Sequence, residues 1–290
     1  MPNVLLLRAP APDGPDKYET AFTDSGYSIY SIPVLETVLT NLSDLERVIR
    51  AGPFMQSFGG VIVTSARACE AWKAVIGAIA HSDNKTSADW SDMPFYVVGK
   101  ATSAAFADLA QSGAPSNLVP RDVRGEESGN AEQLAQFIIE DVEQRPAKLL
   151  YLTGDKNRDT LSRILSSANI EPTPLKVYET QGSSSFAAEL ECFIIGISED
   201  ISGWWIVFFA PSAANFVTPV LRRHFILPST SEAWSQSPSV RLQARLAAIG
   251  PTTSSHLRDS LGLEVHVTAS KPTAEDLVSA IFEYDTAHAA

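Results

Sequence analysis

The chain has 290 residues, of which 44% are hydrophobic and 19% charged, and its formal net charge is −12. This length and apolar content are enough for two domains with buried cores, and they argue against a disordered chain. The acidic balance disfavours nucleic acid or an anionic membrane as partner, because such binding needs Lys and Arg to neutralise phosphates. A small anionic ligand remains open, since one pocket can differ from the average surface.

The two cysteines, Cys69 and Cys192, imply no disulfide framework and have no metal-ligand spacing. We therefore expect a reducing, cytoplasmic environment and no bound metal. The first residues lack the basic leader of a secretory signal, and the apolar runs are too short to span a bilayer.

Short β-rich runs alternate with helix-like stretches along the chain. In the first part, strands are predicted at Val4–Leu7, Ile29–Val34, Val61–Thr64 and Phe95–Val98, and helices at Ala66–Ile79 and Ala101–Gln111. Continuous apolar strands joined by helical crossovers predict a parallel sheet that is covered on both faces.

The second half of the chain repeats the first. GVIVTSARACEAW from Gly60 matches WIVFFAPSAANFV from Trp205, and NAEQLAQFI from Asn130 matches TAEDLVSAI from Thr273. YVVGKATSAAF and LAAIGPTTSSHL form a third pair, and IPVLET and LKVYET a fourth. The four blocks recur in one order at about half the chain length, which predicts a duplicated domain rather than a solenoid.

Small polar residues follow the predicted strands in both halves. In doubly wound sheets, ligands bind beyond the carboxyl ends of the strands, where helix N-termini present unpaired N–H groups. These residues either only cap helices, or they mark several helix N-termini around one cleft that binds carboxylates or phosphates. The set comprises Thr64, Ser65, Thr102, Asn130, Ser212, Thr252 and Thr253.

Several catalytic motifs are missing. The sequence has no GxGxxG after the first strand, and TGDKNRD (Thr153–Asp159) lacks P-loop spacing. There is no GxSxG nucleophile elbow. We expect His256 and Cys69 to be structural. Tyr178 lies in a repeated segment that is able to connect the two domains, so it is a candidate for the cleft.

The quoted motifs, read together, resemble those of the uroporphyrinogen-III synthase family. GGVIVTSARACEAW, YVVGKATSAAF, GNAEQLAQFI, VYET, FFAPSAANF and AAIGPTTSSHL stand in the order seen in that family. The resemblance covers nearly the whole chain, which looks like a eukaryotic member, a fungal one being one option.

The resemblance implies two similar flavodoxin-like α/β domains, joined by a two-stranded linker, with a cleft between them. It implies that residues 1–36 and 181–290 form one discontinuous domain and that residues 40–174 form the other. Segments 37–39 and 175–180 would be the connecting strands. Repetition alone would have placed the boundary near residue 145.

The implied activity is that of a hydro-lyase in heme biosynthesis. It closes hydroxymethylbilane, a polycarboxylate linear tetrapyrrole, to uroporphyrinogen III with loss of water and inversion of ring D. The family resemblance implies no metal and no cofactor. Nothing in the sequence points to an oligomer, so a cytoplasmic monomer is expected.

Residue roles carry over onto matching positions. Tyr178 matches the family's functional tyrosine and is expected to deliver a proton to the departing hydroxyl. Arg67 and Lys100 are expected charge partners of the substrate, and Arg158 is a further candidate. The expected substrate contacts are Thr64, Ser65, Thr102, Asn130, Ser212, Thr252 and Thr253.

Two other functions fit parts of the pattern. A non-catalytic two-lobed binder of a small anion would show the same fold and the same hydroxyls. A two-domain regulator with one DNA-binding lobe is the second alternative, although the acidic charge and the lack of a basic helix speak against it.

Overall fold

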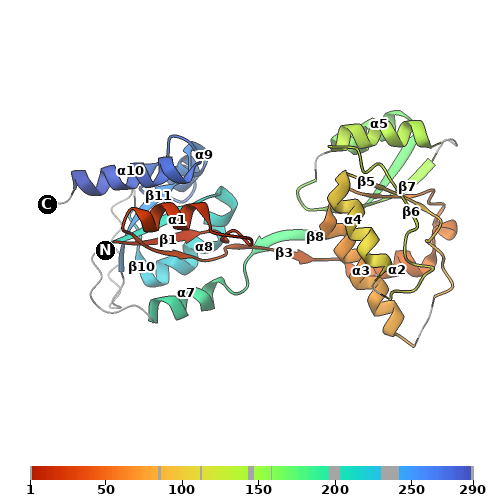
Figure 1. The fold of residues 1–290 in the computed structure, drawn as a ribbon, viewed down its shortest axis with the longest axis horizontal. Coiled ribbons are helices and arrows are strands. Elements are labelled where there is room, and N and C mark those ends of the chain that lie inside the picture. Colours follow the sequence, from red (N-terminus) through yellow and green to blue (C-terminus); the bar gives the residue numbers. More distant parts are fainter. Residues whose placement is uncertain are drawn as a thin grey trace. The chain divides into compact units, whose positions relative to one another are not determined.

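The structure, a computed structural model, describes residues 2–83, 86–111, 113–142, 147–157, 159–195, 203–229 and 242–288. The chain divides into two compact units (Figure 1). Unit 1 combines Met1–Glu36 with Gln181–Ala290, and unit 2 is Thr37–Thr180. The predicted connecting segments 37–39 and 175–180 fall inside unit 2, where the chain passes from one unit to the other.

Unit 2 is built on a sheet with the strand order β3-β8-β7-β4-β5-β6. From β8 to β6 every neighbouring pair is parallel. Continuous apolar runs such as Val61–Val63 are fully buried, as expected for a sheet covered on both faces. The strands are β3 (Leu35–Leu39), β4 (Val61–Val63), β5 (Pro94–Val97), β6 (Asp122–Arg124), β7 (Ala147–Gly154) and β8 (Ile170–Gly182).

Helices cover both faces of this sheet, with α5 on one side and α3 and α4 on the other (Figure 1). Trp72 of α3 is fully buried, packs edge-on against Trp90 at 5.4 Å, and donates its Nε1–H to the Leu118 carbonyl. The helices are α2 (Leu42–Ala51), η1 (Phe54–Gln56), α3 (Ala66–His81), α4 (Gly99–Ala110), α5 (Ala131–Asp141) and α6 (Thr160–Ser167).

Unit 1 has a second parallel sheet, ordered β10-β11-β9-β1-β2, with β12 also paired to β11. The central strand β9 is buried along its whole length. The strands are β1 (Asn3–Leu7), β2 (Ser28–Ser31), β9 (Trp204–Phe208), β10 (Phe225–Ile226), β11 (Leu242–Ala248) and β12 (Val267–Thr268).

The helices of unit 1 also form two layers. One core includes residues of α7, α8 and α9, and the other includes residues of α1 and α10. The helices are α1 (Lys17–Asp24), α7 (Phe186–Ile195), α8 (Pro211–His224), α9 (Pro251–Asp259) and α10 (Ala274–Ala287).

The repeated motifs occupy equivalent places in the two sheets. The pair β4–α3 corresponds to β9–α8, β5–α4 corresponds to β11–α9, and α5 corresponds to α10. The prediction of two similar doubly wound α/β domains is therefore confirmed.

One predicted strand is shorter than expected. Residues 29–34 were predicted as a strand, but β2 ends at Ser31. The Ile32 N–H still donates to the Leu6 carbonyl, and the next residue is Pro33, which has no N–H to continue the pairing. The order of the elements is unaffected by this correction.

No helix in the described part of the chain combines the length and the apolar character needed to cross a bilayer.

Candidate functional site

The predicted site residues gather at one edge of each sheet. In unit 2, helices α3 and α4 begin directly beyond the carboxyl ends of the parallel strands β4 and β5, and α5 follows β6 after a short loop. In unit 1, α8 and α9 begin in the same way beyond β9 and β11, and α10 follows β12 after a short loop. This is the edge at which doubly wound sheets bind ligands.

Two of the predicted contacts act as helix caps. Ser65 Oγ accepts a hydrogen bond from the Arg67 N–H at 3.3 Å, at the start of α3. Asn130 Oδ1 accepts one from the Gln133 N–H at 2.9 Å, at the start of α5. The capping interpretation therefore describes the geometry of Ser65 and Asn130.

The helices of the other three motifs lack a side-chain cap. Val98, Ala210 and Gly250 precede α4, α8 and α9, and none of them has a side chain that accepts from the first turn. The first-turn N–H groups of these helices carry a partial positive charge. These three N-termini are therefore suited to an external anion.

In α8 and α9, the position of proline and the first intrahelical hydrogen bond show which first-turn N–H groups can bind a ligand. Both α8 and α9 begin with proline, which has no N–H at the first position. The first intrahelical bond of α8 is donated by Ala214, so the Ser212 N–H precedes it. In α9 the corresponding donor is Ser254, so the N–H groups of Thr252 and Thr253 precede it.

The predicted hydroxyl residues differ in exposure. Thr102 is only 4% exposed and Thr253 only 3%, so their side chains lie within the protein. Thr64 and Ser212 are half-buried, and Thr252 is exposed. The hydroxyls of Thr102 and Thr253 are therefore less accessible to a ligand than that of Thr252.

The predicted charge partners stand at the surface of unit 2. Arg67 is exposed in the first turn of α3. Lys100 Nζ lies 3.2 Å from Glu127 Oε1, and both side chains are largely exposed. An exposed ion pair of this kind contributes at most about 1 kcal/mol, so an anion is able to displace Glu127. The predicted Arg158 lies outside the described residues.

Tyr178 lies in β8, opposite Gly154 of β7. The register of the two strands shifts by one residue here, from Thr153 opposite Lys176 to Gly154 opposite Tyr178. Tyr178 is half-buried and packs against the core of unit 2. It therefore stands at the carboxyl end of β7, on the edge where α3, α4 and α5 begin.

The loop after β7, which leads to the predicted candidate Arg158, begins at this edge as well. The motif TGDKN lacks P-loop spacing, and Asp155 Oδ1 accepts a hydrogen bond from the Thr180 N–H of β8 at 3.3 Å. The Tyr151 hydroxyl donates to Asn157 Oδ1 at 2.9 Å.

Arg8, at the carboxyl end of β1, was missed in the sequence predictions. Its guanidinium donates to Asp16 Oδ2 at 2.7 Å and lies 4.9 Å from the centre of the Tyr18 ring. Burial acts to raise the pKa of the Asp16 carboxyl, but the bond from Arg8 and backbone N–H groups hold that pKa below its ordinary value. Arg8 is therefore engaged within unit 1, where Asp16 caps α1.

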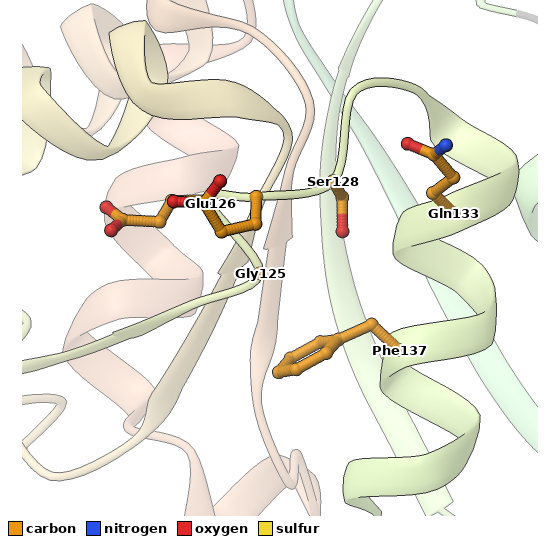
Figure 2. Close-up of a pocket in the computed structure, with 6 residues that line it drawn as sticks. Gly125, Glu126, Ser128, Gln133 and Phe137 are labelled. Carbon is orange, nitrogen blue, oxygen red and sulfur yellow. The ribbon is translucent and has the colours of Figure 1, made fainter.

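A pocket lies beside the start of α5, between the loop after β6 and the helix (Figure 2). Gly125 has a φ of +84°, and a Cβ there would come within 2.7 Å of Leu134 Cδ1. Glu126 and Glu127 line the pocket together with Ser128 and residues of α5. Its two carboxylates make it unsuited to the anionic ligand that the uncapped helices fit.

The described residues include no group of three or more His, Cys, Asp or Glu side chains that is able to hold a metal ion.

The fold and the edges just described define a class: a chain of two doubly wound α/β units, each with helix N-termini at the ligand-binding edge of its sheet. Within that class, a family model described as "Uroporphyrinogen-III synthase HemD" matches residues 16–279. The chain therefore belongs to the uroporphyrinogen-III synthase family, and the predicted resemblance is confirmed.

Two curated relatives have the same family name. The uroporphyrinogen-III synthase of Saccharomyces cerevisiae is 25% identical over 276 residues, covering 93% of this chain and 92% of the relative. That of Schizosaccharomyces pombe is 26% identical over the same shares. Both relatives are fungal, which fits the predicted eukaryotic origin.

Two solved structures align with nearly the whole chain at low TM-scores. The uroporphyrinogen-III synthetase of Helicobacter pylori has a TM-score of 0.43 and 16% identity, covering 98% of this chain and 99% of that one. A mutant uroporphyrinogen III synthase from Thermus thermophilus has a TM-score of 0.38 and 15% identity, covering 99% of this chain and 100% of that one.

Proposed function

We propose that the uncapped helix N-termini hold the carboxylates of hydroxymethylbilane while Tyr178 assists the loss of water. The chain is a lyase of heme biosynthesis that closes hydroxymethylbilane to uroporphyrinogen III, with inversion of ring D. The proposal concerns which residues carry this reaction and how. The observation that supports it most is that α4, α8 and α9 begin without side-chain caps at ligand-binding edges of the sheets.

Carboxylate binding by helix ends explains how an acidic chain holds a polyanionic substrate. The formal net charge is −12, so a general basic surface is not the source of the attraction. Helix N-termini bind anions through oriented N–H groups and a local partial charge, and they need few basic side chains. We assign the carboxylate contacts to the first turns that contain Thr102, Ser212, Thr252 and Thr253.

The side chains around these turns complete the proposed contacts. Thr64 and the capping residues Ser65 and Asn130 border the starts of α3 and α5. Arg67 and Lys100 are the proposed cationic partners, with Lys100 leaving Glu127 for a substrate carboxylate.

The chemistry makes modest demands on the protein. Loss of the hydroxyl from ring A gives an electrophilic azafulvene, and ring D attacks it through its already substituted carbon. The resulting spiro intermediate opens and recloses with ring D turned over. Positioning of reacting groups supplies about 7–11 kcal/mol, whereas a thousandfold preference over spontaneous closure needs only about 4 kcal/mol. Distributed contacts are therefore enough.

Tyr178 is the proposed proton donor to the departing hydroxyl, directly or through water. Its place at the carboxyl end of β7 puts the phenol on the same edge of unit 2 as the helix ends. Giving its proton to the departing hydroxyl leaves Tyr178 as a phenolate, which recovers a proton from the pyrrole N–H as the azafulvene forms, so the step as a whole adds no charge near the substrate.

We further propose a monomer that functions in the cytoplasm. Cys69 and Cys192 are both free thiols, which suits a reducing compartment. Burial, followed by the neighbouring Glu70 carboxylate, raises the pKa of the Cys69 thiol to about 12, so this cysteine is a packing residue and not a nucleophile.

The deciding experiment is an isomer assay. Hydroxymethylbilane made enzymatically is incubated with the purified chain, and the products are oxidised and separated by chromatography. We expect uroporphyrinogen III to predominate, with type I in the enzyme-free control. Type I alone, accompanied by substrate binding, would instead support the non-catalytic anion binder.

A further inference from the structure

We propose that Gly154 is a positioning residue for the cyclisation, because its missing side chain lets the Tyr178 ring lie against its backbone and so sets where the hydroxyl stands. This inference rests on the proposed role of Tyr178. It adds Gly154 to the site, as a residue that acts only by positioning Tyr178.

The contact between these two residues is closer than any side chain at position 154 allows. A Cβ built on Gly154 would lie 2.4 Å from Tyr178 Cε2, 2.5 Å from Cζ and 2.9 Å from the hydroxyl oxygen. All three nearest atoms belong to the hydroxyl-bearing end of one ring. Any substitution at Gly154 therefore displaces the part of Tyr178 that is proposed to react.

A shift in strand register brings the two residues together. Thr153 pairs with Lys176 and Gly154 with Tyr178, so Val177 is the extra residue on β8. Val177 is fully buried in the core of unit 2, and Tyr178 packs against the same core. In a regular ladder Val177 would stand opposite Gly154, so the irregularity is what places the tyrosine there.

The backbone at Gly154 is held firmly, so the tyrosine is the part that must move. β7 lies between β4 and β8 in the sheet. Directly after Gly154, Asp155 Oδ1 accepts from the Thr180 N–H of β8. Asn157 is held by the hydroxyl of the buried Tyr151. A side chain at position 154 is therefore accommodated by rotation of the Tyr178 ring.

The backbone conformation of Gly154 does not itself require glycine. Its φ lies outside the left-handed region, in contrast to Gly125 and Gly99. Alanine at position 154 consequently meets the Tyr178 ring but no backbone strain. This makes Gly154→Ala a clean probe of the contact.

The test is a double-mutant cycle of Gly154→Ala and Tyr178→Phe. Phenylalanine keeps the ring, and hence the overlap, but removes the hydroxyl. We expect Gly154→Ala to lower kcat for type III formation by about 10- to 100-fold with a smaller change in KM. In the Tyr178→Phe background, Gly154→Ala should lower the melting temperature as much as it does in the native background. It should leave the residual kcat of Tyr178→Phe unchanged.

Gly60→Ala is the matched control. A Cβ at Gly60 would lie 3.0 Å from Tyr96 Cε2 and 3.0 Å from the Pro94 carbonyl, immediately before β4 of the same sheet. It should lower the melting temperature without the selective loss of kcat. Equal losses of kcat in Gly60→Ala and Gly154→Ala would overturn the inference.

The remaining outcomes separate the inference from the proposed function. If Tyr178→Phe leaves kcat unchanged, the proposed proton transfer fails and the inference fails with it. If Tyr178→Phe lowers kcat but Gly154→Ala does not, or does so equally in both backgrounds, only the inference fails. Should Gly154→Ala not fold, the variant is combined with Tyr178→Ala, which removes the overlap; recovery of folding supports the contact, and failure to recover overturns it.

Discussion

The carboxylate of Asp285 accepts a hydrogen bond from the Tyr27 hydroxyl at 3.0 Å, linking α10 to the start of β2. The same carboxylate accepts from Trp205 Nε1 at 3.1 Å and from the Arg245 guanidinium at 2.8 Å. Burial and then Asp285 raise the pKa of the Tyr27 phenol above its ordinary range, so its O–H remains a donor. The Asp285 side chain thus joins α10 to Tyr27 before β2, to Trp205 of β9 and to Arg245 of β11.

Unit 2 contains a related arrangement at the end of α5. Asp141 accepts from the Tyr96 hydroxyl at 2.9 Å and from the Arg124 guanidinium at 2.6 Å. Each aspartate lies in the last turn of its helix, where a negative charge opposes the helix dipole. The donated hydrogen bonds offset that unfavourable position, and they recur because the two units repeat one plan.

Removal of the Asp285 carboxylate should destabilise unit 1. We expect Asp285→Ala to lower the free energy of unfolding by about 2–4 kcal/mol, because the buried Trp205 N–H and the Tyr27 hydroxyl lose their acceptor. Urea denaturation measures this change. Glu283→Ala, an exposed position on the same helix, is the control and should change stability by less than about 0.5 kcal/mol. Equal effects of the two substitutions would contradict this view of Asp285.

Acidification should weaken unit 1 through His266. Burial is the main cause that lowers the pKa of this imidazole; Glu264 acts in the opposite direction, and Arg245 and His288 act in the same direction. The Leu246 N–H donates to His266 Nδ1 at 3.2 Å, which favours the neutral ring. The unfolded chain binds the proton first, so stability is complete above the unfolded pKa of about 6.5 and falls as the pH drops below it.

The measurement is urea denaturation at pH 7.5 and pH 5.5 in the native chain and in His266→Phe. We expect the stability of the native chain to decrease more steeply between these values than that of the variant. Identical slopes would show that other groups carry the acid sensitivity.

The order of strands and helices and the duplication could be predicted from sequence because both are encoded locally. Apolar runs such as Val61–Val63 and a helix-period pattern from Ala66 are visible in a single window. Ser65 and Asn130 could be predicted as helix caps for the same reason. Repetition could not give the boundaries at Glu36 and Thr180, because the first strands pack with the last third of the chain.

The contact between Gly154 and Tyr178 could not be predicted, because it depends on pairing between strands. The two residues are far apart in sequence, and the register shift that aligns them is set by how β7 and β8 pack together. The absence of side-chain caps on α4, α8 and α9 could not be predicted from the sequence either. Thr102, Ser212 and Thr252 suggested caps, but each lies inside the first turn of its helix.

Loss of the Tyr178 hydroxyl should lower the rate without unfolding the chain. We expect Tyr178→Phe to reduce kcat about 100-fold or more if proton donation is lost, and to leave the melting temperature within a few degrees of the native value. Stopped-flow assay of type III formation measures the rate. Tyr30→Phe, a half-exposed tyrosine of unit 1, is the control substitution and should retain the native rate.

A carboxylate placed at the N-terminus of α9 should stabilise unit 1 and raise KM for the substrate. Gly250 precedes α9 in an extended conformation, φ 178°, and a Cβ there would meet no atom within 4 Å. Gly250→Asp therefore places a capping carboxylate on the free N–H groups of Thr252 and Thr253. We expect it to stabilise unit 1 by up to about 1 kcal/mol, as favourable caps do. It should also raise KM for hydroxymethylbilane several-fold, because the added carboxylate occupies the donors that the substrate needs and repels its charge.

Two further variants at Gly250 separate two effects of the added carboxylate: occupation of the N–H donors and repulsion of the substrate's charge. Gly250→Asn caps the helix without charge and should raise KM less than Gly250→Asp, while Gly250→Ala neither caps nor repels and should leave KM near the native value. Steady-state kinetics and thermal denaturation of the three variants measure both effects. If Gly250→Asp becomes more stable and KM does not change, the N-terminus of α9 does not bind the substrate. The other uncapped ends, α4 and α8, would then have to supply the carboxylate contacts, and Ala210→Asp applies the same test to α8, where Ala210 is the residue before the helix.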